Sequence, residues 1–97
     1  MKKKIYISGP ISGHDLEVRR RVFSDAAKAA AALGYEPVSP FENGVPEDAP
    51  WEEHMRADIK MLLNCQAILM LPGWKDSKGA RTELIIANTL NMQTFKV

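Results

Sequence analysis

The pattern of apolar and polar positions predicts four strands along the chain. Lys4–Ser8 is a short apolar run typical of a buried strand, and Ala67–Leu71 (AILML) is an unbroken apolar run typical of a strand covered on both faces. Tyr35–Ser39 contains Pro37, which favours a strand near an edge of the sheet. Thr94–Val97 is predicted to be the last strand.

Apolar residues at helical spacing predict three helices between these strands. Leu16–Leu33 carries an apolar stripe and is followed by Gly34, a typical C-cap glycine. Trp51–Asn64 and Gly79–Asn91 are the other two helices. This alternation predicts a three-layer α/β domain, flavodoxin-like or Rossmann-like, with a small parallel sheet in the order 2-1-3-4. We interpret residues 1–97 as a single domain of this kind.

Three loops follow the predicted strands, and ligands of open parallel sheets bind beyond the carboxyl ends of the strands. We therefore expect Ser8–Gly13, Ser39–Pro50 and Pro72–Lys78 to surround one crevice. Backbone N–H groups of the first loop, SGPISG, are suited to an anion. The loop matches neither G-x-G-x-x-G nor G-x-x-x-x-G-K-[ST], so a simple tight turn at Gly9 and Gly13 is the alternative to the phosphate or sugar-phosphate site that we favour.

Two carboxylates lie on the apolar sides of their predicted helices. Asp58 falls at the edge of the apolar stripe of the second helix, and Glu83 falls within that of the third. Ordinary explanations exist: Asp58 would pair with Arg56 or a lysine, and Glu83 would stabilise the first turn of its helix and pair with Arg81 or Lys78. Alternatively, both carboxylates face the crevice and form an acid/nucleophile pair.

Composition narrows the class of protein. The chain has 13 basic and 12 acidic residues, which indicates neither a nucleic-acid polymer nor a membrane surface as partner. Cys65 is the single cysteine, so no internal disulfide and no cysteine cluster is expected, and the two histidines lack metal-ligand spacing. The apolar run after the basic start is too short for a signal peptide. We expect a cytoplasmic protein without a bound metal, and a homodimer or higher homo-oligomer.

Three segments together resemble the nucleoside 2-deoxyribosyltransferase superfamily. They are YISGPISG, ADIKMLLNCQAILMLPGW and SKGARTELIIANTL, and they extend over nearly the whole chain. The first and the second are the more specific. The similarity is greatest to the small bacterial and phage-associated members grouped as a domain of unknown function, DUF4406.

The resemblance implies cleavage or transfer at the N-glycosidic bond of a small nucleoside or nucleotide, without a cofactor. It makes Glu83, in GARTEL, the nucleophile that holds the sugar as an ester. Asp58, in ADIKML, becomes the acid/base or positioning group, and Tyr6 orients Glu83. These are the carboxylates that helical periodicity also selects, and glycoside chemistry uses such pairs.

The transferases typically carry D-x-G-x-x-x-E, and Ser77 stands in place of that aspartate here. A serine at this place resembles the branch that hydrolyses deoxynucleoside 5′-monophosphates, where it meets the phosphate. That branch usually has an arginine in the first loop, where this chain has Ser12, so Arg81 or Arg19 would supply the charge. Trp74 or Trp51 would cover the base. The remaining predicted substrate-binding residues are Ser8, Gly9, Pro10, Ile11, Ser12, Gly13, Ser77 and Gly79.

Two other interpretations stay open. The sequence after the nucleophile is E-L-I-I-A, where the family often has E-L-G-Y-A, and this favours a nucleotide or nucleotide-sugar binding module that has lost its catalysis. A purely structural or interaction domain requires both inward carboxylates to be incidental.

Overall fold

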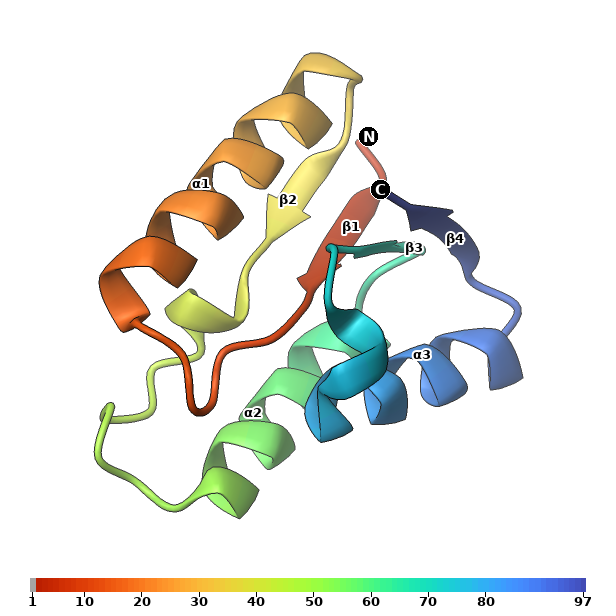
Figure 1. The fold of residues 1–97 in the computed structure, drawn as a ribbon. Coiled ribbons are helices and arrows are strands. Elements are labelled where there is room, and N and C mark those ends of the chain that lie inside the picture. The colour runs from red at the N-terminus through yellow and green to blue at the C-terminus, as the bar shows by residue number, and fades with distance from the viewer. Residues whose placement is uncertain (1) are drawn as a thin grey trace.

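A computed structural model describes residues 2–97 and contains a four-stranded parallel sheet in the order β2-β1-β3-β4 (Figure 1). The predicted α/β fold class and strand order are therefore confirmed. The sheet and its helices follow each other along the chain as β1 (Lys4–Ser8), α1 (Leu16–Ala32), β2 (Glu36–Val38), α2 (Trp51–Leu63), β3 (Ala67–Met70), α3 (Lys78–Thr89) and β4 (Gln93–Lys96).

β1 has the predicted bounds, and the ends of the other elements differ from the predicted ones by at most two residues. β2 has only three residues, and the loop after it begins with a 3₁₀ helix at Pro40–Glu42 whose first amide is capped by the Ser39 hydroxyl. Lys78 precedes the predicted start of α3 because Ser77 is the N-cap and accepts from the Ala80 N–H. Glu83 consequently lies beyond the first turn of α3, so the expected first-turn position of this residue was wrong.

Successive side chains of the central strands point to opposite faces of the sheet, so the sheet separates two apolar cores. On β1, Ile5 and Ile7 face α1 and pack in a cluster with Phe23 and Ala30. Tyr6 faces the opposite side, where α2 and α3 lie, and shares a cluster with Leu62 and other residues of these helices. Ser8, two residues after Tyr6, is on that same side of the strand and is fully buried. The sheet thus presents two polar side chains of β1 to α3.

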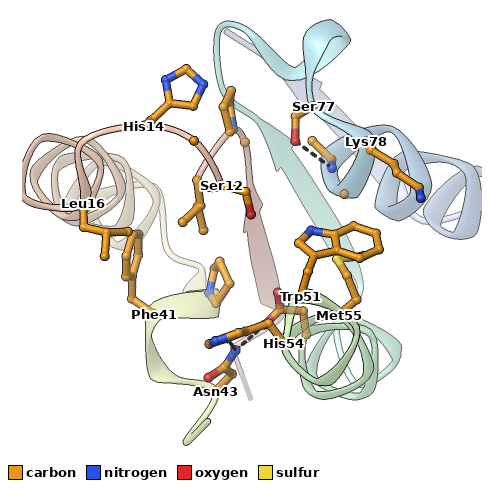
Figure 2. A pocket seen from close by; sticks show the side chains of 18 of the residues that line it. Ser12, His14, Leu16, Phe41, Asn43, Trp51, His54, Met55, Ser77 and Lys78 are labelled. Atoms are coloured by element: carbon orange, nitrogen blue, oxygen red, sulfur yellow. Dashed lines mark hydrogen bonds between the residues drawn. The ribbon is translucent and has the colours of Figure 1, made fainter. Parts of the chain in front are cut away.

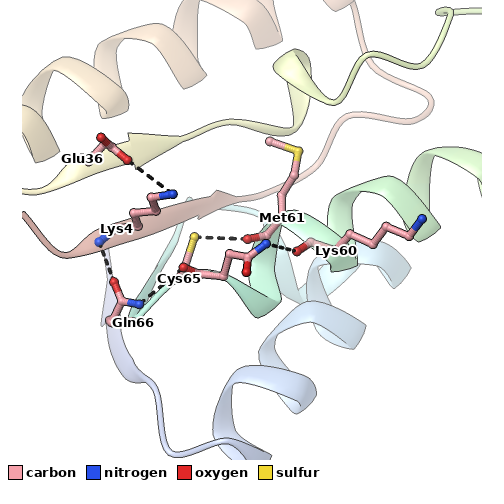
Figure 3. A network of polar contacts seen from close by, with 7 residues as sticks. Lys4, Glu36, Lys60, Met61, Cys65 and Gln66 are labelled. Atoms are coloured by element: carbon pink, nitrogen blue, oxygen red, sulfur yellow. Dashed lines mark hydrogen bonds and ion pairs between the residues drawn. The ribbon is translucent and has the colours of Figure 1, made fainter.

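The amino end of the sheet is held by contacts unrelated to the crevice (Figure 3). The Lys4 N–H donates to Gln66 Oε1 at 2.8 Å, and the Lys4 ammonium lies 3.7 Å from Glu36. Both side chains of this ion pair are about half exposed, so its contribution to stability is small. Cys65 is buried here, and burial raises the pKa of its thiol to about 11. The thiol is therefore protonated at neutral pH and unreactive.

Candidate functional site

A cavity of about 560 Å³ lies beyond the carboxyl ends of the strands, a volume typical of small-molecule sites. The three loops predicted to surround a crevice all contribute to its wall, together with α2 and α3. In Figure 2, Ser77 lies toward the top of this cavity, Ser12 near its middle, and Asn43 and His54 toward the bottom. Both Asp58 and Glu83 line it.

Glu83 is held by two hydroxyl groups of β1. Tyr6 Oη donates to Glu83 Oε2 at 2.7 Å, and Ser8 Oγ donates to Glu83 Oε1 at 2.7 Å. Both oxygens of the carboxylate are thus oriented by residues i and i+2 of one strand, which share a face of the sheet. Glu83 is only 4% exposed. The contact between Tyr6 and Glu83 that the resemblance implies is present.

The ordinary explanation for Glu83 is not what the structure shows. Arg81 donates instead to the carbonyl of Lys75 at 2.8 Å, and the ammonium of Lys78 lies over the ring of Trp51. Neither cation forms an ion pair with Glu83 within residues 2–97. A carboxylate buried without a cation is costly unless hydrogen bonds hold it, as Tyr6 and Ser8 do here.

The protonation of Glu83 is shifted by its surroundings. Burial raises the pKa of Glu83 to about 7, the hydrogen bonds from Tyr6 and Ser8 oppose this rise, and the charge of Asp58 adds to it. The pKa of the Tyr6 phenol is raised well above its usual value, first by burial and then by Glu83. Tyr6 therefore remains a hydrogen-bond donor at every pH at which the protein would work.

Asp58 is held by an amide and not by a cation. Asn43 Nδ2 donates to Asp58 Oδ1 at 2.8 Å, and Asp58 is 7% exposed. Arg56 is exposed, and no ion pair between it and Asp58 is present in the described chain. Burial raises the pKa of Asp58 to about 6, against the lowering effects of Asn43 and His54. A carboxyl group with such a pKa can both give and take a proton near neutral pH.

The first loop, Gly9–Gly13, lines the cavity. The structure explains why both of its glycines are needed for the shape of the loop. A Cβ at Gly9 would lie 2.9 Å from Leu71 Cβ, so close packing requires the glycine. Gly13 adopts φ +80°, which the turn requires. The amide N–H groups of Ile11, Ser12 and Gly13 nevertheless make no hydrogen bond within residues 2–97. These free donors leave the prediction of an anion site open.

The other predicted binding residues have mixed positions. Ser77 and Gly79 line the cavity, and Ser77 also caps α3. Ser8 was predicted to contact substrate, but it is fully buried and binds Glu83. Trp74 is not part of the cavity wall and packs against the core beneath α3, whereas Trp51 lines the cavity. Of the two tryptophans, the structure brings only Trp51 to the site.

Several wall residues were not among the predicted site residues, and four of them make polar contacts with one another or with Asp58. Asn43 and His54 lie at the Asp58 end, and Arg20 and Glu47 form an ion pair with each other in the cavity wall. Asn43 and Glu47 belong to the long loop between β2 and α2, residues 39–50, where no periodicity indicates which side chains turn inward. His54 lies one turn before Asp58 on α2, and this i, i+4 spacing was the one available signal.

Neither of the two arginines suggested for the missing loop charge lines the cavity. Arg81 is turned toward the Lys75 carbonyl. Arg19 lies behind the first loop, where its Nε donates to the Pro10 carbonyl at 2.6 Å. The cavity wall instead contains Arg20 and Lys78.

Two kinds of feature are absent from residues 2–97. No group of three or more His, Cys, Asp or Glu side chains is placed to hold a metal ion. None of the helices has both the length and the apolar character needed to cross a membrane. The absence of a cofactor and the cytoplasmic location stay predictions.

Comparison with known proteins identifies the family. A profile of the domain of unknown function DUF4406 matches residues 3–96. The chain belongs to this family. No curated protein is significantly similar to it in sequence.

Solved structures of 2-deoxyribosyltransferases have the same fold as this DUF4406 domain. The 2-desoxiribosyltransferase from Leishmania mexicana matches with TM-score 0.74 and 20% identity over 97% of this chain and 63% of its own. The 2-deoxyribosyltransferase from Bacillus psychrosaccharolyticus matches with TM-score 0.72 and 20% identity over 96% and 70%. A conserved protein from Enterococcus faecalis V583 matches with TM-score 0.73 and 18% identity over 99% and 63%. The chain thus spans less than two thirds of the Leishmania enzyme.

Proposed function

We propose that this DUF4406 domain is an N-glycosidase or deoxyribosyltransferase-like enzyme that acts on a small nucleoside or nucleotide. The supporting observation is the carboxylate of Glu83, which two hydroxyl donors hold at the wall of a cavity that also contains Asp58. A fixed, poorly solvated carboxylate is suited to attack on an electrophilic sugar carbon. The shared fold of the two named transferases is consistent with this chemistry.

In the proposed reaction, an oxygen of Glu83 bonds to C1′ of the sugar as the bond from C1′ to the base breaks. The electron pair of that bond goes to the base, and Asp58 gives the base a proton. Water or a second base then attacks C1′ and gives its proton to the Asp58 carboxylate, and the ester to Glu83 breaks. Tyr6 and Ser8 keep Glu83 in place and stabilise its charge.

A 5′-phosphate is proposed to lie at the first loop. The unpaired amides of Ile11, Ser12 and Gly13 support this, because such donors bind anions. Ser77 and Lys78 line the same cavity at the start of α3. Trp51 is proposed to cover the base, since it is the tryptophan at the cavity wall.

Incubation of the purified protein with ribo- and deoxyribonucleosides and their 5′-monophosphates tests the proposal. Chromatography would follow the free base, and Glu83→Gln would be compared with wild type. We expect base release from at least one substrate and a loss of about 100-fold or more in Glu83→Gln, which cannot form the ester. Equal release by both proteins would exclude Glu83 as the nucleophile.

A second candidate function is a nucleotide-binding module without catalysis. The observation that favours it is that Ser77, at the place of the transferases' aspartate, is engaged in capping α3. Ile85, in contrast, is 65% exposed and not in the cavity wall, so this departure from the family sequence does not crowd the site. Nucleotide binding without any base release would favour this candidate. A homodimer or higher homo-oligomer remains part of the proposal.

A further inference from the structure

Asn43 makes three polar contacts at the Asp58 end of the cavity (Figure 2). Asn43 Oδ1 accepts from the Val45 N–H at 2.9 Å, and Asn43 Nδ2 donates to Asp58 Oδ1 at 2.8 Å. The same Nδ2 lies 3.1 Å from His54 Nδ1. One amide therefore connects the backbone of the long loop to two titratable side chains of α2.

These contacts determine which atoms carry protons. The Val45 N–H is a donor, so the oxygen of Asn43 must face it, and the NH₂ group must face α2. An NH₂ group has two protons and serves both partners as a donor. His54 Nδ1 is then an acceptor, which places the ring proton on Nε2.

Asp58 is left with one free oxygen. Oδ1 accepts from Asn43, whereas Oδ2 has no hydrogen bond within residues 2–97 and is not completely enclosed. When Asp58 is protonated, its proton is favoured on Oδ2, because Oδ1 already faces a donor. His54 Nε2 is likewise without a partner in the described chain. Both side chains line the cavity, so two O–H or N–H donors are available there.

We propose that Asn43 is a positioning residue that reserves Asp58 Oδ2 for the proton given to the leaving base and fixes His54 Nε2–H as a second donor on the same wall. This inference rests on the proposed function. In that step the proton passes from Asp58 Oδ2 to a nitrogen or oxygen of the base, and the electron pair of the broken C1′–N bond stays on the base. The leaving group is accordingly a base with a hydrogen-bond acceptor toward α2.

The surroundings of Asp58 make the role of Asn43 measurable. The charged or titratable groups that act on or near Asp58 are His54 on α2, Glu83 on α3 and Tyr6 on β1. The hydrogen bond from Asn43 lowers the pKa of Asp58, against burial. Loss of that bond therefore raises the pKa of Asp58. The protonated form of Asp58, which acts as the acid, then persists to higher pH.

The test compares Asn43→Asp with Asn43→Ala. The aspartate keeps an oxygen for the Val45 N–H and removes the donor to Asp58 and His54, but it also adds a negative charge beside Asp58. The alanine removes the donor without adding a charge, so it isolates the effect of the lost hydrogen bond. The control is Asn64→Ala, which removes an exposed amide bonded to the Lys60 carbonyl outside the cavity. Rates of base release would be measured against pH for each protein.

For both Asn43→Ala and Asn43→Asp we expect a fall in kcat of about tenfold or more and a basic limb displaced to higher pH, with the larger displacement in Asn43→Asp because of its added charge. Asn64→Ala should retain the wild-type profile. A purely structural role of Asn43 would change stability but would leave the position of the limb unchanged. Wild-type kcat and a wild-type limb in Asn43→Asp would overturn the proposal.

Nuclear magnetic resonance gives a readout that does not need activity. The ¹⁵N shifts of His54 should show the proton on Nε2 in wild type, and the ¹³C shift of the Asp58 carboxyl should titrate at higher pH in Asn43→Asp. Absence of base release by wild type would overturn the proposed function. An unchanged Asp58 titration would overturn the role of Asn43, whether or not the wild type is active.

Discussion

Tyr6 and Ser8 show how single residues set the chemistry of the site. Each donates one hydrogen bond to one oxygen of Glu83, and both are fully buried. A hydroxyl group is small enough to lie in the apolar face between sheet and helix and still satisfy a carboxylate. The result is a nucleophile candidate with a fixed orientation in a poorly solvated place, which is the condition that nucleophilic catalysis needs.

Tyr6→Phe is the clearest prediction at this scale. It removes the bond to Glu83 Oε2, so the pKa of Glu83 should rise above about 7 and the acidic limb of the rate profile should move to higher pH. Stability should fall by about 1–3 kcal/mol because a buried acceptor loses its partner. The measurements are the pH–rate profile and urea unfolding.

Tyr35→Phe is the matched control for this variant. Tyr35 also donates its hydroxyl to a side-chain oxygen, that of Gln93, but this bond is exposed and lies outside the cavity wall. The control should leave the acidic limb in place. The same displacement in both variants would argue against a specific role of Tyr6.

At the scale of elements, β1 and the loop that follows it form a unit. β1 supplies the two donors to Glu83, and the loop continues directly into the cavity wall. The loop is seated against the next element, because Gly9 approaches Leu71 at the end of β3. The position of the loop amides therefore depends on packing between two neighbouring strands.

Gly9→Ala should weaken nucleotide binding. Its Cβ would lie 2.9 Å from Leu71 Cβ, an atom attached to the backbone that cannot rotate away, so the loop must shift. We expect a stability loss of about 1–3 kcal/mol and a larger loss of nucleotide affinity than stability alone explains. Isothermal titration calorimetry and urea unfolding measure the two effects.

Gly34→Ala is the control that separates a loss of stability from a loss of nucleotide affinity. Gly34 has φ +94° after α1 and no place in the cavity wall, and a Cβ there would meet no atom of residues 2–97 within 4 Å. The variant should lose about 1 kcal/mol of stability from backbone strain and retain wild-type affinity. If both variants bind equally, the packing of Gly9 does not position the binding loop.

At the scale of the whole molecule, two carboxylates are buried in one small domain without a cationic partner among residues 2–97. Burial raises the pKa of Glu83 from 4.5 to about 7 and that of Asp58 from 3.8 to about 6. Their ionised forms therefore oppose folding, a cost typical of sites organised for function and not for stability.

The free energy of unfolding should fall between about pH 4.5 and about pH 7, because the folded state of Glu83 holds its proton more tightly than the unfolded state. The stabilisation is complete below the unfolded pKa and is lost as pH rises through the folded one. Glu83→Gln removes this dependence and should gain up to about 3 kcal/mol relative to wild type between about pH 4.5 and about pH 8. Urea unfolding at both pH values measures the difference.

Asp58 also titrates in this range, with a pKa of about 6, so the comparison between the two proteins is the informative quantity. Parallel changes with pH in wild type and Glu83→Gln would contradict the raised pKa of Glu83. A smaller pH dependence in the variant would support it. The same experiment with Asp58→Asn isolates the second carboxylate.

Local sequence patterns were sufficient to predict the α/β architecture, the strand order and the two inward carboxylates. Apolar periodicity is a local property, and the alternation of periods 2 and 3.6 leaves few topologies for four strands and three helices. The directions of Asp58 and Glu83 follow from the same periodicity. The pairing of Tyr6 with Glu83 came from the resemblance to a family, since no local pattern joins residues 77 positions apart.

The completion of the site depends on the folded chain. Folding turns Asn43 inward from the long loop, directs Ser8 to Glu83, and keeps Trp74 out of the cavity while Trp51 enters it. Loops have no periodicity from which the direction of a side chain follows, and their inward residues are selected by hydrogen bonds to groups far along the chain. The pKa values depend on burial and on these long-range partners, so they too are properties of the folded molecule.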